Sequence, residues 1–296
     1  MQNRNYTAWL HWNPTDKCNL ACTYCLTKQT SNTENNRSSW QIFNQKEKIN
    51  TIAIDKFNQT LEQTKLTFKI SFTGGGEPFI IPNLVELCGV LAKKHFLSFN
   101  TNLTSNKISN FIKIVPPEKV MDIGASLHVD ELFRLNLQNR FIENYLLLRK
   151  NGYNICAREI AHPSFSSRVP QIKKYFSARG IEVHFDPYVG EYKSKQYPEA
   201  YTSEELNQFG LQRLHNNTEN IHQQENKICN AGYNAAYISP TGEIFQCPSI
   251  PKKIGHIYTE IKFQETLSNC TADFCVCPLN KYDTPLFEKA KKETNT

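Results

Sequence analysis

The chain has 296 residues, 39% of them hydrophobic, which permits one large domain or a core domain with a smaller appendix. Lys and Arg exceed Asp and Glu by 34 to 28, and the net charge of +6 suits anionic ligands. No basic stripe interleaved with aromatic residues is present, so we expect no nucleic-acid partner. No apolar segment is long enough for a signal peptide or a membrane span, so we expect a cytoplasmic protein with no membrane partner.

The first two-thirds of the chain alternate strand and helix patterns. Strands separated by helices pair in parallel, so six such units predict an α/β fold with a parallel sheet. Six units are too few to close an eight-stranded barrel, and a partial (β/α)6 barrel is expected. The predicted strands cover residues 7–12, 66–73, 96–102, 121–128, 154–162 and 181–189. The predicted helices cover residues 51–65, 82–95, 105–114, part of 130–150, and 170–178.

The other segments predict loops and a smaller C-terminal unit. Residues 28–50 are polar and predict a surface loop, and residues 190–226 predict a connector. Within the connector, Thr202 and Glu205 form a capping-box pattern that begins a helix ending near Leu214. A hairpin is predicted over 235–246 and a charged helix over 284–293. We therefore expect a core domain over residues 1–195 and a small domain over 196–296.

The spacing of the first cysteines points to a metal cluster. In a reducing compartment, ten cysteines are more typical of metal ligands or core residues than of disulfides. Cys18, Cys22 and Cys25 form a C-x3-C-x2-C pattern directly after the first predicted strand. Thiolates are the ligands of iron–sulfur clusters, and one loop with this spacing can wrap three corners of a cubane. The fourth iron then stays open for chemistry. A structural zinc site is the alternative, but such sites take four ligands and favour C-x2-C pairs.

This cysteine pattern resembles the signature of the radical S-adenosylmethionine (SAM) superfamily, and the resemblance covers about residues 7–190. It implies that the open iron chelates the methionine part of SAM. Reductive cleavage then gives methionine and a 5′-deoxyadenosyl radical, which abstracts a hydrogen atom from a substrate. Tyr24 matches the aromatic residue that borders the adenine in this family. A flavodoxin- or ferredoxin-type reductant is also implied, because SAM cleavage needs a low-potential electron.

The resemblance extends to the ends of the next strands. Gly75, Gly76 and Glu77 match the family's GGE segment, which binds the SAM amino group. Glycine lets the backbone approach a ligand closely, and a carboxylate accepts a hydrogen bond from an ammonium group. The resemblance implies further SAM contacts from Asn102 and Ser126, near the ends of the third and fourth predicted strands. Arg158, on the fifth predicted strand, could pair with the SAM carboxylate.

Several residues near these strand ends allow more than one interpretation. Arg158 could equally form a salt bridge at the edge of the core. His128 replaces an aspartate of the family pattern and could face the substrate. His162 and His184 also lie near strand ends, but each is more typical of a structural hydrogen-bonding residue. Two further cysteines, Cys88 and Cys156, are interpreted as core residues.

Five cysteines follow residue 228. Cys229, Gly242 and Cys247 fit C-x12-G-x4-C, which resembles the start of the auxiliary-cluster domains called SPASM and twitch. SPASM domains carry seven cysteines and two clusters, so five cysteines imply the one-cluster twitch type. Cys270 is left over and is our candidate catalytic hydrogen donor, with a buried, inert thiol as the alternative. The second [4Fe–4S] cluster is assigned to Cys229, Cys247, Cys275 and Cys277, with a zinc site as the alternative.

These features predict a radical SAM enzyme of the oxidoreductase or epimerase type that acts on a small polar, carbohydrate-like molecule. The chain begins a few residues before its first predicted strand, so we expect no N-terminal peptide-recognition domain. One-cluster relatives act on small polyhydroxylated metabolites. Modification of a ribosomally made peptide is the alternative within enzymes. A non-catalytic iron–sulfur electron carrier is the alternative from another class, but a carrier would not need a GGE segment to hold SAM.

Overall fold

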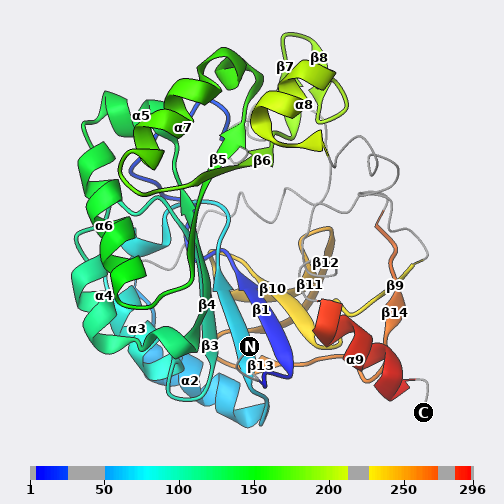
Figure 1. The fold of residues 1–296 in the computed structure, drawn as a ribbon. Helices are drawn as coiled ribbons and strands as arrows, with labels where there is room; N and C mark the ends of the chain where they lie inside the picture. Colours follow the sequence, from blue (N-terminus) through cyan, green and yellow to red (C-terminus); the bar gives the residue numbers. More distant parts are fainter. Residues whose placement is uncertain (1–4, 26–50, 213–226, 273–283, 295–296) are drawn as a thin grey trace.

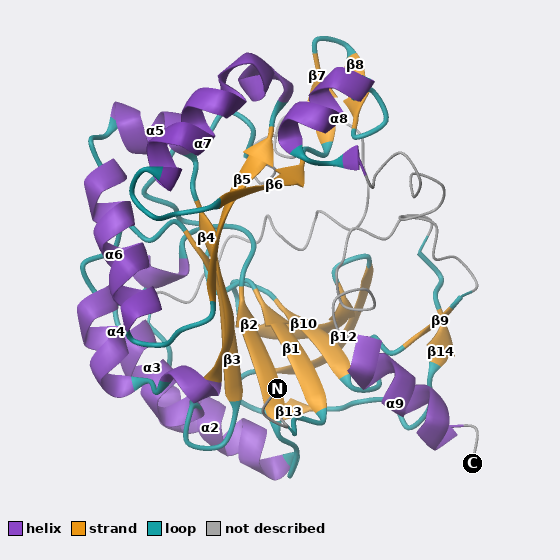
Figure 2. Ribbon diagram, in the orientation of Figure 1, coloured by secondary structure: helices purple, strands orange, loops and turns teal. Residues whose placement is uncertain are grey.

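The computed structural model describes residues 5–25, 51–212, 227–272 and 284–294. The six predicted strands are all present, and they lie side by side in chain order and in parallel. Helices cover one face of this sheet (Figures 1 and 2). The predicted α/β fold is therefore confirmed. The six strands are β1 (Ala8–Trp12), β2 (Phe68–Phe72), β3 (Phe96–Thr101), β4 (Val120–Ser126), β5 (Ile155–Ala161) and β6 (Val183–Pro187).

Apolar and polar side chains alternate along β2, and the helices cover the face that carries the apolar ones. In β2, Phe68, Ile70 and Phe72 point into the main core, whereas Lys69 and Ser71 lie on the opposite face. Each fully buried apolar side chain contributes about 2 kcal/mol relative to exposure. The covering helices are α2 (Ile54–Gln63), α3 (Leu84–Leu91), α4 (Ile108–Ile114), α5 (Val129–Arg134), α6 (Gln138–Lys150) and α7 (Val169–Ser177).

The segment over residues 130–150 holds two helices rather than the one expected. Asn136 adopts a left-handed conformation with φ 56° between α5 and α6. A residue in that conformation cannot continue a right-handed helix, so α5 ends there and α6 begins on a new axis. Helix α5 begins at Val129, soon after β4 ends at Ser126, so its N-terminus lies at the carboxyl end of β4. The described part of the core also contains 3₁₀ helices at η2 (Pro78–Ile80), η3 (Pro117–Lys119) and η4 (Pro163–Arg168).

The C-terminal part of the chain extends the same sheet. The predicted hairpin is present as β10 (Ala235–Ile238) and β11 (Glu243–Cys247), with Tyr237 opposite Phe245. Two strands that the sequence did not predict follow, β12 (Ile250–His256) and β13 (Glu260–Ile261). Strand β10 pairs in parallel with β1, so the ten-stranded sheet runs β13-β12-β11-β10-β1-β2-β3-β4-β5-β6. The division into domains over 1–195 and 196–296 stays a prediction.

The connector also contains regular structure. Helix α8 (Ser203–Phe209) begins with the predicted capping box between Thr202 and Glu205, and ends at Gly210, before the expected Leu214. A small hairpin precedes it, formed by β7 (Gly190–Tyr192) and β8 (Lys195–Tyr197). The predicted loop over 28–50 and the end of the connector lie outside the described residues. The remaining elements are β9 (Ile228–Cys229), β14 (Ser268–Asn269) and α9 (Thr284–Thr294).

None of the described helices combines the length and the apolar character needed to cross a membrane.

Candidate functional site

The three N-terminal cysteines lie on the loop that follows β1, at the carboxyl end of the parallel strands. Cys18 is exposed, Cys22 is buried and Cys25 is partly buried. The segment before Cys18 pairs with the glycine loop that follows β2. The Gly76 N–H donates to the Thr15 carbonyl at 2.7 Å, and the Glu77 N–H donates to the Lys17 carbonyl at 2.9 Å. These two hydrogen bonds place the cysteine loop and the glycine loop next to one another.

The glycine loop needs glycine because the two loops touch through their backbones. Gly75 has φ +66°, and a Cβ added there would overlap the side chain of Asn13. A Cβ on Gly76 would overlap the Lys17 carbonyl. When its amide is oriented to satisfy both neighbours, Asn13 donates to the Gly74 and Thr15 carbonyls at 2.9 and 2.8 Å. A side chain at either glycine would therefore separate the two loops.

Glu77 is 3% exposed, and its carboxylate accepts three hydrogen bonds from the protein. The Thr101 hydroxyl donates to Oε1 at 2.7 Å, and the Asn102 N–H donates to Oε2 at 2.7 Å. The Phe79 N–H donates to Oε1 at 3.1 Å and caps the start of η2. Burial raises the pKa of Glu77 above its usual value, opposed by these donors. The carboxylate thus ties the glycine loop to the end of β3, and its predicted contact with the SAM amino group stays a prediction.

Asn102 connects the end of β3 to the cysteine loop. It is 2% exposed, and its side-chain amide donates to the Asn19 side chain at 2.9 Å. The same nitrogen lies 3.9 Å from the Cys18 sulfur. Its oxygen accepts from the N–H and the hydroxyl of Thr104 at 3.1 and 2.7 Å. The predicted site residues Asn102, Glu77 and Cys18 are therefore brought together.

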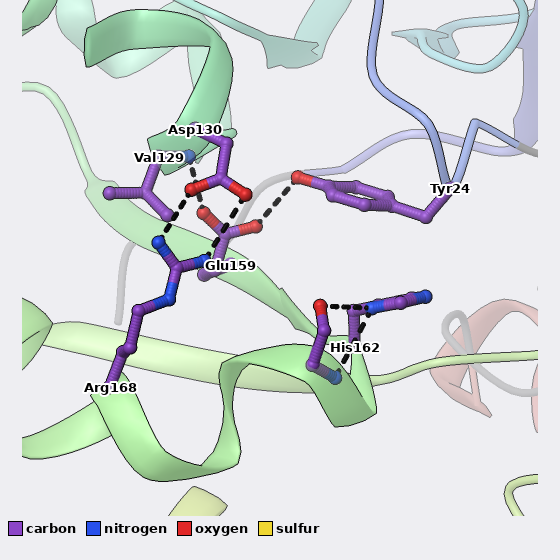
Figure 3. Close-up of polar contacts among 7 residues, drawn as sticks. Tyr24, Val129, Asp130, Glu159, His162 and Arg168 are labelled. Atoms are coloured by element: carbon purple, nitrogen blue, oxygen red, sulfur yellow. Dashed lines mark hydrogen bonds and ion pairs between the residues drawn. The ribbon is translucent and has the colours of Figure 1, made fainter. Parts of the chain in front are cut away.

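The Tyr24 side chain points from the cysteine loop toward Glu159 of β5 (Figure 3). Its ring is 7% exposed and stacks on His162 at a centroid distance of 5.7 Å. Its hydroxyl donates to Glu159 Oε1 at 3.0 Å and lies 3.1 Å from His128 Nδ1. Burial raises the pKa of Tyr24, and the Glu159 carboxylate raises it further. The tyrosine is therefore neutral and fixed in position.

The remaining predicted residues lie on the sheet face away from the helices. Ser126, the last residue of β4, is partly buried and stands opposite Arg158 in the parallel register. Arg158 Nη1 lies 3.1 Å from an Asp186 carboxylate oxygen, and both side chains are partly exposed. Arg158 thus forms the salt bridge of one interpretation, and its contact with SAM stays a prediction. His128 has φ 45°, and burial lowers its pKa to about 4.

The cysteine loop crowds thiols in a way that favours a bound cation. Burial raises the pKa of Cys22 to about 12, and the neighbouring Cys25 and Cys18 act in the same direction. Thiolates form at neutral pH in such surroundings only when a cation neutralises them, and the irons of a [4Fe–4S] cluster provide that charge. Within the described ranges, no three His, Cys, Asp or Glu side chains are arranged to hold a metal ion. A cubane binds each thiolate through a different iron, so its ligands need not converge on one point.

Comparison of the sequence with models of protein families and with curated proteins gives no match. Comparison of the structure with solved structures does. A histidine-tagged form of anSMEcpe with bound AdoMet (SAM) aligns with a TM-score of 0.55 and 16% identity over 84% of this chain and 74% of that one. Native anSMEcpe with bound AdoMet gives 0.54 and 16% over 85% and 78%. Native anSMEcpe with AdoMet and the Kp18Cys peptide gives 0.53 and 16% over 85% and 78%.

This chain shares its fold with anSMEcpe. The likeness at this identity concerns the fold, and the residue roles rest on the geometry described above.

Two of the C-terminal cysteines, Cys229 and Cys247, lie near Trp9 of β1. Cys247 is buried in a small cluster with Trp9 and Leu286, and Cys229 packs against that cluster. Cys270 is 7% exposed, and its N–H donates to the Lys227 carbonyl at 2.9 Å. Cys275 and Cys277 lie outside the described residues. The ligand set of an auxiliary cluster therefore stays a prediction.

Two carboxylates next to the cysteine loop were not found from the sequence. Glu131, in the first turn of α5, accepts from the Ala21 N–H at 2.7 Å and pairs with Arg134 at 2.8 Å. Glu159, on β5, accepts from Tyr24. No motif marks either residue. For Glu159 the available signal is an acidic residue inside a strand that is otherwise largely apolar.

Cys88 and His162 have the structural environments that were expected, whereas His184 and Cys156 do not. Cys88 is fully buried on α3. His162 is 8% exposed, and its Nδ1 accepts from the Ser164 N–H at the start of η4. His184 is exposed, with a side chain 3.9 Å from Glu182. Cys156 differs because it is only partly buried, on the face of β5 that also carries Arg158.

Proposed function

We propose that this protein is a radical SAM enzyme that cleaves SAM and abstracts a hydrogen atom from a substrate. The observation that carries the proposal is the backbone pairing between the loop of Cys18, Cys22 and Cys25 and the loop of Gly75 and Gly76. A cluster site and a close-approach glycine site need to be adjacent for SAM to contact both. A [4Fe–4S] cluster bound by the three cysteines would supply the electron for SAM cleavage.

The surrounding residues have separate tasks in this proposal. Glycine at positions 75 and 76 lets the glycine loop pack directly against the cysteine loop, which would bring its backbone polar groups beside the methionine part of SAM. Asn102 and Glu77 fix the two loops relative to one another. Tyr24 provides a rigid aromatic wall for the adenine. A flavodoxin- or ferredoxin-type protein is the proposed electron donor.

A second cluster is proposed for the C-terminal cysteines. Ser268 pairs with Cys229 where β9 and β14 run antiparallel. One step further along, the backbone N–H of Cys270 donates to the Lys227 carbonyl. Residues two apart on paired strands share a face, so Cys229 and Cys270 point to the same side as diagonal neighbours. This geometry supports Cys270 as a cluster ligand and weighs against its predicted role as a free hydrogen donor.

Cys270→Ala distinguishes the two roles. Loss of auxiliary-cluster iron would identify Cys270 as a ligand. Full iron content, with loss of solvent deuterium from a product formed in heavy water, would identify it as the hydrogen donor. Full iron content with unchanged deuterium incorporation would identify it as a bystander.

A small polar molecule remains the favoured substrate. The sheet face away from the helices carries the partly exposed ion pair of Arg158 and Asp186. Such side chains suit hydroxyl, amine and carboxylate groups of a compact substrate. Peptide modification is the second candidate, and one observation favours it: a solved structure with this fold holds the Kp18Cys peptide. A small molecule would be epimerised or dehydrogenated, and a peptide would be epimerised or cross-linked.

The test uses hydrogen transfer to SAM as the readout. The reconstituted, reduced protein would be incubated with SAM and a fully deuterated cell extract, separated into small-molecule and peptide fractions. Mass spectrometry of 5′-deoxyadenosine then reports which fraction donates deuterium. Deuterium from the small-molecule fraction alone supports the first candidate, and deuterium from the peptide fraction alone supports the second. 5′-Deoxyadenosine without deuterium from either fraction would contradict both.

A further inference from the structure

Glu159 is a buried carboxylate that the proposed chemistry does not use, although it lies beside the proposed SAM site. It is 1% exposed, and it accepts three hydrogen bonds, of which those from Val129 and Tyr24 are drawn in Figure 3. The Val129 N–H donates to Oε2 at 2.7 Å, the Ile160 N–H to Oε1 at 2.8 Å, and the Tyr24 hydroxyl to Oε1 at 3.0 Å. Burying a carboxylate is costly, so its three donors offset a penalty that an apolar residue would not incur.

The three donors come from three different segments. Val129 is the first residue of α5, Ile160 belongs to β5, and Tyr24 belongs to the cysteine loop. The carboxylate therefore fixes the cysteine loop against the junction between β4 and α5. The neighbouring Asp130 does not share this role. Its exposed carboxylate pairs with Arg168 in a two-pronged contact of 2.9 and 3.1 Å.

Tyr24 has few other polar restraints. Its ring is enclosed by His162, His128 and Phe165, whose contacts restrict its position but do not fix its hydroxyl. The hydroxyl is held by Glu159 and lies within reach of His128 Nδ1. Removing the carboxylate would let the ring rotate or shift at the place where the cysteine loop meets the SAM site.

We propose that Glu159 is a positioning residue for SAM, acting through the Tyr24 hydroxyl to hold the aromatic wall of the SAM site in place. This inference rests on the proposed function. It concerns affinity for SAM rather than the radical chemistry, since Glu159 is covered by Tyr24 and touches no reacting atom. It predicts that losing the carboxylate and losing the hydroxyl have the same consequence.

The experiment is a double-mutant cycle with Tyr24→Phe and Glu159→Gln in the reconstituted protein. Glu159→Gln keeps the shape of the Glu159 side chain but presents an amide N–H₂ toward its donors. Tyr24→Phe keeps the aromatic ring of Tyr24 but removes its hydroxyl. The dissociation constant for SAM is measured by the change in the electron paramagnetic resonance signal of the reduced cluster. Iron content and thermal midpoint are measured in the same samples. Asp130→Asn is the matched control, because it removes an acidic residue next to Val129 without touching Tyr24.

The expected results are specific. Each single variant should weaken SAM binding by about tenfold, as expected for one hydrogen bond to a charged group, and the double variant should be no weaker than the worse single variant. The KM for SAM should rise while kcat changes by less than about threefold. Asp130→Asn should stay within about twofold of the wild type. Additive effects of the two variants, or unchanged SAM affinity in Glu159→Gln with full iron content, would overturn the inference.

Failure of the proposed function gives a different outcome. A wild-type protein that neither binds nor cleaves SAM refutes the function, whatever the variants do. If Glu159→Gln loses iron or fails to fold, Tyr24→Phe alone decides the question, because it leaves the buried carboxylate bonded to two backbone N–H groups. Tyr24→Phe with wild-type SAM affinity would then overturn the inference.

Discussion

Replacing Glu77 by Ala should destabilise the fold and disconnect the glycine loop from the end of β3. The structure gives the magnitude. Two backbone N–H groups and the Thr101 hydroxyl would lose their acceptor in a buried place, at about 1–3 kcal/mol each. Removing a buried carboxyl, whose pKa is already raised by burial, returns part of that loss. We therefore expect the free energy of unfolding to fall by about 3–5 kcal/mol, measured by urea unfolding of the metal-free protein.

Thr101→Val is the matched control for Glu77→Ala. It removes one of the three donors while leaving the carboxylate in place, and it also removes the acceptor of the Leu103 N–H, so it should cost about 2 kcal/mol. After reconstitution, Glu77→Ala should also bind SAM at least tenfold more weakly, because Asn102 and the glycine loop are no longer held together. A loss below about 1 kcal/mol in Glu77→Ala, or a loss equal to that of Thr101→Val, would refute the role given to the carboxylate.

Three further predictions concern a buried histidine, a glycine of the glycine loop and the iron content. Burial lowers the pKa of His95 to about 4 from 6.5, and the neutral ring accepts a hydrogen bond at Nδ1 from the Phe68 N–H. The contribution of neutral His95 to the free energy of unfolding is therefore complete above pH 6.5 and lost as the pH falls through 4. The loss is about 3 kcal/mol, and unfolding of His95→Gln across this pH range should show a flatter profile. Gly76→Ala should lower 5′-deoxyadenosine formation at least tenfold, because its Cβ would overlap the Lys17 carbonyl; wild-type turnover would contradict the close loop contact. The wild type should bind about eight irons per chain and a variant lacking the three N-terminal cysteines about four, and zinc or no iron in that variant would contradict the second cluster.

Local patterns in the sequence were sufficient to predict the six parallel strands. In β2, apolar residues alternate with Lys69 and Ser71, so strand and buried face could both be predicted. The capping box at Thr202 predicted the start of α8 for a similar reason, since it depends on residues three apart. The end of α5 could not be predicted, because it depends on the left-handed conformation of Asn136, and no glycine at that position marks such a conformation in the sequence.

Long-range pairing accounts for most of what the sequence did not predict. The hairpin of β10 and β11 was predicted from its turn, but its parallel pairing with β1 joins residues more than two hundred positions apart. The same limit applies to the site. Cysteine spacing and the glycine loop predicted which residues gather there, whereas Glu159 was missed because its donors, Tyr24 and Val129, come from distant segments.

The measurement that tests the central claim most directly is SAM cleavage by the reconstituted, chemically reduced protein. The account predicts that the wild type converts SAM to equal amounts of methionine and 5′-deoxyadenosine. The triple variant Cys18→Ala, Cys22→Ala, Cys25→Ala should form neither product. 5′-Deoxyadenosine formation by that variant, or none by a fully iron-loaded wild type, would contradict the account.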